Sequence, residues 1–136
     1  MFEEEPRTFH DYCSPGGFHS FEHRWALKEA FEFQLKIGKR RVMERTHQLS
    51  SLLKEGLQRI KHVKLHTPVD PALSAGINCF EIDGLSPDDF VTRMAEHSVI
   101  ASSSPYRTSY ARLTPSIVNT EEEVQKCIEV IENLKG

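Results

Sequence analysis

The chain has 136 residues, of which 38% are hydrophobic and 27% are charged. This length is enough for one domain with its own hydrophobic core, and it is short for a complete metabolic enzyme. The formal net charge of −3 gives no electrostatic reason to expect a nucleic acid or a membrane surface as a partner. The composition is that of an ordinary soluble domain.

Cysteine usage and the start of the sequence set the expected compartment. Cys13, Cys79 and Cys127 show neither metal-ligand spacing nor a disulfide framework, which suits a reducing environment. Cys79 and Cys127 have apolar neighbours and are predicted to be small core residues. No stretch approaches the roughly 20 apolar residues of a membrane span, and the acidic start is unlike a signal peptide. We therefore expect a cytoplasmic protein.

Two helices are predicted after an irregular start. Residues 1–19 lack periodicity and are rich in proline and glycine, which predicts an extended arm. Ser20 is a suitable N-cap for a first helix, and Gly38 is expected to separate it from a second. We assign residues 20–61 to these linker helices. Their apolar positions recur at helical spacing, as Leu27, Phe31 and Leu35 with Ala30, Phe33 and Ile37, then Val42, Thr46, Leu49, Leu53, Leu57 and Ile60 with Met43 and Leu52.

The hydrophobic period changes after residue 61. Alternating or continuous short apolar runs predict strands at residues 63–66, 76–82, 99–101 and 110–114. Ser86 is followed by proline and two aspartates, which predicts the start of a helix. Thr120 is followed by three glutamates, which predicts the start of a final helix.

These elements predict an α+β fold. Helices segregated to one face of a mainly antiparallel sheet would bury the apolar stripes, which gives a two-layer sandwich. Residues 62–136 would form its core, preceded by the long linker helix. Ferredoxin-like and regulatory ligand-binding modules have a similar alternation of elements, so the pattern leaves the function open.

The glycine-rich segment 14–20, directly before the first helix, is one candidate binding site. Adjacent glycines allow backbone N–H groups to approach an anion closely, and a helix N-terminus adds partial positive charge. The alternative is that the segment is only a flexible lead-in with an N-cap.

Arg112 is the second candidate. If residues 110–114 form a strand, Ala111 and Leu113 point to one face and Arg112 points to the other. An arginine held in this way presents a rigid fork that matches a carboxylate. The alternative is an exposed arginine paired with a surface acid.

The histidines and the basic residues give weaker evidence for a functional site. His19 and His23 lack the order of the zinc-protease motif, and no metal site is predicted. The basic residues between 36 and 45 lie on a helical pattern and are interpreted as a solvated face, so no nucleic acid is expected. The lysines are expected on exposed helix faces or at strand ends, where none would act as a nucleophile.

Two segments, taken in order, resemble the class V aminotransferase family of fold-type I enzymes that use pyridoxal phosphate (PLP). They are GGFHSFEHRWAL at residues 16–27 and ARLTPSIVNTEEE at residues 111–123. The second is similar to the family's closing pattern, an arginine on a strand followed by Asn-Thr and an acid-rich helix start. The first segment is closest in form to the branch of cysteine C–S lyases, cysteine desulfurases and isopenicillin N epimerase-like proteins. The resemblance implies the C-terminal small domain of a homodimeric transferase or lyase that acts on amino acids.

The resemblance also implies roles for individual residues. Arg112 would hold the α-carboxylate of the substrate, with Arg107 as the second choice. Gly17, His19 and Ser20 would border the cofactor phosphate, and Phe18 stands near the position where the family usually has threonine. The lysine that binds PLP covalently belongs to the family's large domain. No catalytic residue is therefore expected in this chain, which should be inactive alone and should not bind PLP stably.

A different class of function stays open, a stand-alone protein-interaction or small-ligand-binding module. In that case Trp25, Phe31 and Phe33 of the first helix would form an apolar patch that promotes association with another chain.

Overall fold

The computed structural model describes residues 21–134. The chain divides into two compact units, the first ending at Ile37 and the second beginning at Gly38. The predicted arm at residues 1–19 and the predicted N-cap Ser20 lie outside the described residues.

Helix α2, Phe21–Ile37, is the described part of the first unit, and it contributes no buried side chain. Its predicted apolar stripe is exposed, since Phe31 is 66% and Leu35 is 67% exposed. The helix ends at Gly38, whose φ of +94° lies in a left-handed region that residues with a Cβ rarely adopt. The predicted break at Gly38 is confirmed.

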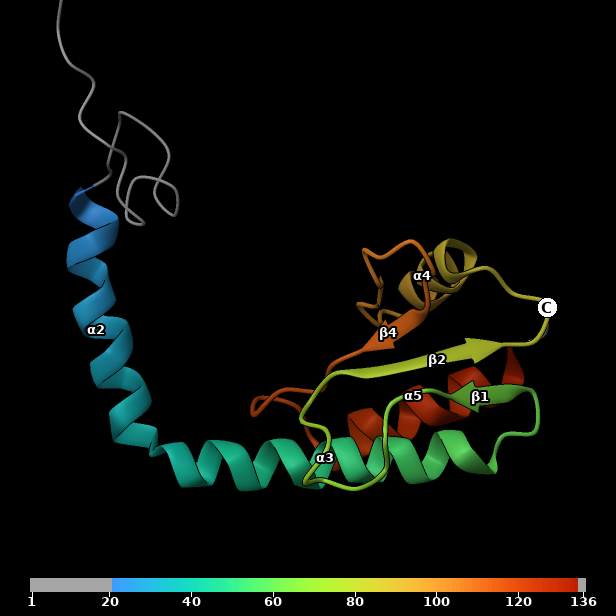
Figure 1. The fold of residues 1–136 in the computed structure, drawn as a ribbon, viewed down its shortest axis with the longest axis horizontal. Helices are drawn as coiled ribbons and strands as arrows, with labels where there is room; N and C mark the ends of the chain where they lie inside the picture. The colour runs from blue at the N-terminus through green and yellow to red at the C-terminus, as the bar shows by residue number, and fades with distance from the viewer. Residues whose placement is uncertain (1–20, 135–136) are drawn as a thin grey trace, which may run out of the picture. The chain divides into compact units, whose positions relative to one another are not determined.

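Helix α3, Lys39–Arg59, is an amphipathic helix of the second unit. Leu49, Leu53 and Leu57 recur every four residues and are almost completely buried, as their spacing predicts. Met43 differs from the prediction and is 54% exposed, because the first turns of α3 extend past the sheet (Figure 1). No helix among residues 21–134 is long and apolar enough to cross a membrane.

Four short strands form an antiparallel sheet in the spatial order β1-β2-β4-β3. Their bounds are Val63–Leu65 for β1, Asn78–Ile82 for β2, Ser102–Ser103 for β3 and Ala111–Leu113 for β4. Strands β1, β2 and β4 lie within the predicted ranges.

The third strand begins later than predicted. The backbone N–H of Val99 donates to the Met94 carbonyl (3.0 Å) and so closes the preceding helix. Ser98 reverses the chain with a φ of +61°, and Ile100 is 98% exposed. The prediction of a strand at residues 99–101 is therefore wrong, because these residues complete the end of the helix and pairing with β4 begins at Ser102.

Two further helices begin at the predicted caps. Helix α4, Pro87–Glu96, follows Ser86, whose hydroxyl accepts a hydrogen bond from the backbone N–H of Asp89. Helix α5, Glu121–Asn133, follows Thr120, which forms a reciprocal capping box with Glu123. Both predicted N-caps are confirmed.

The helices of the second unit pack on one face of the sheet, which confirms the α+β two-layer prediction. Phe80 of β2 contacts Phe90 of α4 edge to face, with ring centroids 5.3 Å apart. Helices α3 and α5 run alongside each other (Figure 1), and a Cβ at Gly56 of α3 would overlap the side chain of Ile128. The buried core consists of Leu49, Leu53, Leu57, Ile60, Phe80, Ile82, Phe90, Met94, Ala111, Leu113, Val124, Cys127, Ile128, Ile131 and Leu134.

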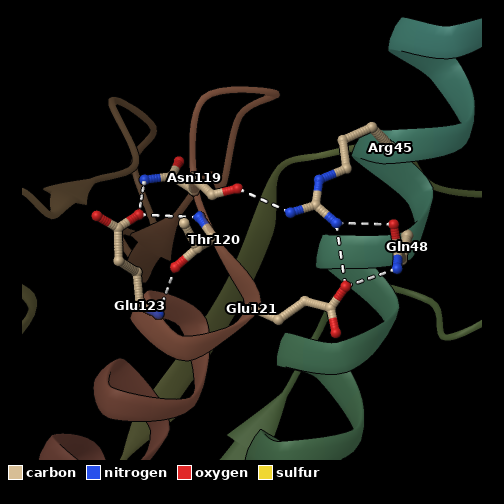
Figure 2. Close-up of polar contacts among 6 residues, drawn as sticks. All are labelled: Arg45, Gln48, Asn119, Thr120, Glu121 and Glu123. Atoms are coloured by element: carbon tan, nitrogen blue, oxygen red, sulfur yellow. Dashed lines mark hydrogen bonds and ion pairs between the residues drawn. The ribbon is translucent and has the colours of Figure 1, made fainter.

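A polar network fastens α3 to the start of α5 (Figure 2). The guanidinium of Arg45 donates to the Asn119 carbonyl (3.0 Å) and to the Glu121 carboxylate (3.1 Å). Gln48 donates to the same Glu121 oxygen (2.8 Å). The interpretation of the basic run at residues 36–45 as a solvated face therefore fails for Arg45, whose side chain is only 31% exposed.

Cys127 of α5 is buried as predicted, and burial raises the pKa of its thiol from 9.0 to about 12. Between these two pKa values the folded chain keeps a proton that the unfolded chain loses. The free energy of unfolding must therefore fall as the pH rises through this window.

We expect this thiol to make the stability of the wild-type chain depend on alkaline pH. Between pH 8 and pH 11 the wild type should lose about 3 kcal/mol of unfolding free energy relative to Cys127→Ala, which has no thiol to ionise. Urea unfolding followed by circular dichroism at each pH measures the difference. Other titrating groups are common to both proteins and cancel. A difference that stays constant across this range would show that the thiol does not titrate as expected.

Candidate functional site

The face of the sheet opposite the helices carries polar and charged side chains. Phe80, Ala111 and Leu113 turn into the core, so the residues that alternate with them along the strands point to the other side. Cross-strand pairing adds their neighbours from β1 and β3. We call this surface the open face, and it comprises Lys64, His66, Cys79, Glu81, Ser102, Tyr110 and Arg112.

Cys79 lies on this open face, although it was predicted to be a core residue. It is only partly buried, because Asn78 and Phe80 occupy the inward positions of β2. Its apolar sequence neighbours suggested burial, and strand alternation placed it on the other side.

Arg112 lies on β4 between two strands of the open face. Its register partners are Cys79 on β2 and Ser102 on β3. The Ser102 hydroxyl accepts a hydrogen bond from Arg112 Nε (2.9 Å). Within residues 21–134 no carboxylate pairs with Arg112, and its two terminal nitrogens form no hydrogen bond. The fork of the guanidinium is therefore available to a carboxylate from outside this part of the chain.

An aromatic pair spans the open face beside Arg112. The rings of His66 and Tyr110 have centroids 4.2 Å apart and meet across the central strand β2. His66 Nε2 is 3.1 Å from one Glu81 oxygen, and Lys64 Nζ is 3.7 Å from the other. The buried Nε2 makes no hydrogen bond, so its contact with Glu81 is an ion pair only when His66 is protonated. Glu81 has its own cationic neighbour in Lys64 and does not neutralise Arg112.

The other residues predicted for the site are not brought together with Arg112. Arg107 is exposed in the connection between β3 and β4, and the described residues show no contact between it and Arg112. Gly17, His19 and Ser20 lie outside the described residues. Sequence reasoning missed Ser102, which follows the predicted third strand directly. The pairing of β3 with β4 reveals it, and that register has no local sequence signal.

Lys54 of α3 contradicts the expectation that the lysines are exposed. It is 1% exposed. Its ammonium donates to the carbonyls of Pro68 (3.2 Å) and Val69 (3.0 Å) and to the Ser74 hydroxyl (2.8 Å). Burial lowers the pKa of Lys54, and the nearby Asp70 carboxylate opposes this effect. The three contacts fasten the loop between β1 and β2 to α3, which is a structural role.

No lysine among residues 21–134 has an amine that is both desolvated and free of hydrogen bonds to the fold. A PLP enzyme binds its cofactor through a desolvated lysine amine that reaches the cofactor aldehyde. Lys54 is desolvated, but its amine is held by three oxygens inside the fold. The other lysines in this part of the chain are exposed. The same residues also contain no group of three or more metal-ligating side chains that could hold an ion.

A cavity of about 510 Å³ lies on the helix side of the sheet. It opens between the end of α4 and the start of α5, and Val99, Leu113 and Cys127 are among its lining residues. Arg112 does not line it, because Leu113 points inward where Arg112 points outward. Lys126 is the cation that borders the cavity, and it is exposed. We therefore place the candidate carboxylate site on the open face rather than in this cavity.

The family model described as aminotransferase class-V matches residues 17–127. The chain belongs to the class V aminotransferase family. The sequence prediction of this family is confirmed, and the fold agrees with a PLP-transferase small domain. No relative is found for the chain among curated protein sequences.

Similar solved structures extend the comparison. The apo cysteine desulfurase from Thermococcus onnurineus NA1 has a TM-score of 0.66 and 25% identity, over 71% of this chain and 26% of that one. The cystine C–S lyase C-DES with its product cysteine persulfide has a TM-score of 0.60 and 21% identity, over 68% and 24%. A C-DES mutant with glycine covalently linked to its PLP cofactor has a TM-score of 0.59 and 21% identity, over 68% and 23%. The chain spans about a quarter of the length of these structures.

The surroundings of Lys54 predict that PLP cannot label it in the folded chain. After PLP addition and borohydride reduction, we expect no adduct at Lys54, because its amine is buried and hydrogen-bonded. Lys64 is the matched control, since its side chain is 70% exposed, and it should be labelled to a low extent. In urea both lysines should react similarly. Peptide mass spectrometry measures the adducts, and selective labelling of Lys54 in the folded chain would overturn its structural role.

Proposed function

We propose that this chain is the C-terminal small domain of a PLP-dependent class V enzyme, in which Arg112 binds the α-carboxylate of an amino-acid substrate. The guanidinium of Arg112 carries this proposal, because it lies on the open face, is held by Ser102 and has no carboxylate partner within residues 21–134. A bidentate pair with a carboxylate is the interaction that such a fork forms best. Arg107 is the second choice for the same role.

The reaction proposed is cleavage of a carbon–sulfur bond, removal of sulfur or epimerisation of an amino acid. The names of the solved relatives, a cysteine desulfurase and a cystine C–S lyase, support the first two of these reactions. When bound, PLP supplies the electron sink for such chemistry. In this proposal a large domain carries the lysine that holds PLP, and this chain orients the substrate through its carboxylate. The chain alone is then inactive and does not bind PLP stably.

The arrangement of the whole enzyme is part of the same proposal. Residues 1–19 would form the arm at the large-domain junction, residues 20–61 the linker helices, and residues 62–136 the core of the small domain. Gly17, His19 and Ser20 would border the cofactor phosphate in a homodimer. The absence of a disulfide between Cys79 and Cys127 suits the cytoplasm, where we expect the enzyme to act.

Binding of the carboxylate by Arg112 can be tested on the chain itself. We expect L-alanine to shift the side-chain NMR signals of Arg112 in the ¹⁵N-labelled chain. Ethylamine, which lacks the carboxylate, should leave them unchanged. Arg112→Lys should weaken the effect of L-alanine on nearby backbone signals about fivefold or more, because an ammonium cannot form the bidentate pair. Arg107→Lys tests the second choice for this role, and it should bind as the wild type does if Arg112 is the carboxylate site. If Arg112→Lys binds L-alanine as well as the wild type, Arg112 is not the carboxylate site.

One observation favours a second function, a module that associates with another protein through α2. This helix has no buried residue, and its large apolar side chains are exposed. Trp25 is 74%, Phe31 66% and Phe33 60% exposed. Exposed apolar groups of this size usually mark a surface that another protein covers.

If α2 is such a surface, the purified chain should self-associate with rising concentration. Replacing Trp25, Phe31 and Phe33 together by serine should remove the association, because the apolar area that drives it is lost. Replacing Glu29 by serine on the same helix is the control and should change little. Sedimentation velocity measures the distribution of species. A wild-type chain that stays monomeric at high micromolar concentration would count against this function.

A further inference from the structure

We infer that Ser102 is a positioning residue that admits a substrate carboxylate to only one edge of the Arg112 guanidinium, the end formed by Nη1 and Nη2. This inference rests on the proposed function of Arg112 as the carboxylate-binding residue. It adds to that site a residue that restricts how the carboxylate can bind. Ser102 lies in none of the segments that resemble the family motifs.

The chemistry of the guanidinium provides the first step. A guanidinium has five N–H donors in one plane, and a carboxylate can pair with two of them along either of two edges. One edge is the end with Nη1 and Nη2, and the other is the side that includes Nε. The single Nε–H of Arg112 already donates to Ser102 Oγ at 2.9 Å. The side edge is therefore occupied by the protein, and only the end remains for a bidentate contact.

The position of the Ser102 hydroxyl is itself fixed by strand pairing. Ser102 is the register partner of Arg112, so their side chains leave the sheet on the same face. The next residues hold β3 in this register, because Ser104 donates its backbone N–H to the Tyr110 carbonyl (2.9 Å). The Ser104 hydroxyl accepts the Tyr110 backbone N–H in return (2.9 Å). Ser104 is 5% exposed, so this anchor is protected from water.

The surroundings of Arg112 show what its hydrogen bond to Ser102 achieves. Arginine has a long side chain that loses rotational freedom when it binds a ligand, and prior fixation reduces that loss. No carboxylate within residues 21–134 restrains the guanidinium, so Ser102 is the side chain of this part of the structure that orients it. A monocarboxylate that approaches in the plane of the guanidinium is the ligand that suits this geometry.

Acetate titration of the ¹⁵N-labelled 136-residue chain, at constant ionic strength with chloride as the balancing anion, tests the inference. In the wild type we expect acetate to shift the Nη signals of Arg112 and to leave its Nε–H signal almost unchanged. In Ser102→Ala the Nε–H becomes free, so acetate should shift this signal as well. The apparent affinity should fall about threefold to tenfold, since the guanidinium is no longer fixed.

Two control variants separate positioning from stability. Ser102→Thr keeps the hydroxyl and should behave as the wild type does. Ser103→Ala removes the neighbouring hydroxyl of β3, which lies on the other face, and should also leave acetate binding unchanged. If Ser102→Ala does not fold, Ser102→Cys keeps the size of the side chain with a poor acceptor, and the same exposure of Nε–H is expected.

The outcomes distinguish this inference from the function on which it rests. If acetate leaves Nε–H unshifted in the folded Ser102→Ala or Ser102→Cys variant, with wild-type affinity, Ser102 does not position the guanidinium. The function of Arg112 would still stand if Arg112→Lys weakens the effect of acetate about fivefold or more. If Arg112→Lys binds acetate as the wild type does, the proposed function fails and the role of Ser102 fails with it.

Discussion

The second unit depends on helices α3, α4 and α5 covering the same face of a four-stranded sheet. An antiparallel sheet tolerates this arrangement, because its other face can meet water or another surface while its backbone hydrogen bonds stay intact. Burial of Ala111 and Leu113 under the helices then determines the direction of Arg112 between them. Arg112 obtains a defined direction from the packing of its neighbours, whereas Arg107 is exposed in the connection between β3 and β4.

The sequence pattern that follows Arg112 has a structural explanation of its own. Thr120 and Glu123 satisfy the first N–H groups of α5, and Asn119 adds a hydrogen bond to the same glutamate (3.1 Å). Arg45 and Glu121 tie this helix start to α3 (Figure 2). The Asn-Thr and glutamate pattern therefore fixes the connection from β4 to α5. Such a pattern identifies the fold of the family, and it says less about the reaction than the single arginine before it does.

The sequence predicted best those features that depend on residues close together in the chain. The caps Ser86 and Thr120 and the break at Gly38 depend on neighbouring residues, and all three were predicted correctly. The start of β3 depends on how the chain leaves α4, and burial of Lys54 depends on a loop that begins more than ten residues later. The face of Arg112 followed from strand alternation. Its partner Ser102 depends on strand register, which only the folded structure reveals.

Two surfaces of the chain lack a partner within residues 21–134, and they differ in chemistry. Helix α2 exposes large apolar side chains, for which association with protein is favourable. The open face exposes a guanidinium held by Ser102, for which an anion is the natural ligand. A stand-alone interaction module accounts for the first surface and gives no reason for the second. A PLP-binding domain accounts for both, because it would supply protein to cover apolar side chains and a bound amino acid to pair with Arg112. This economy favours the proposal of an enzyme's small domain over the proposal of a stand-alone module.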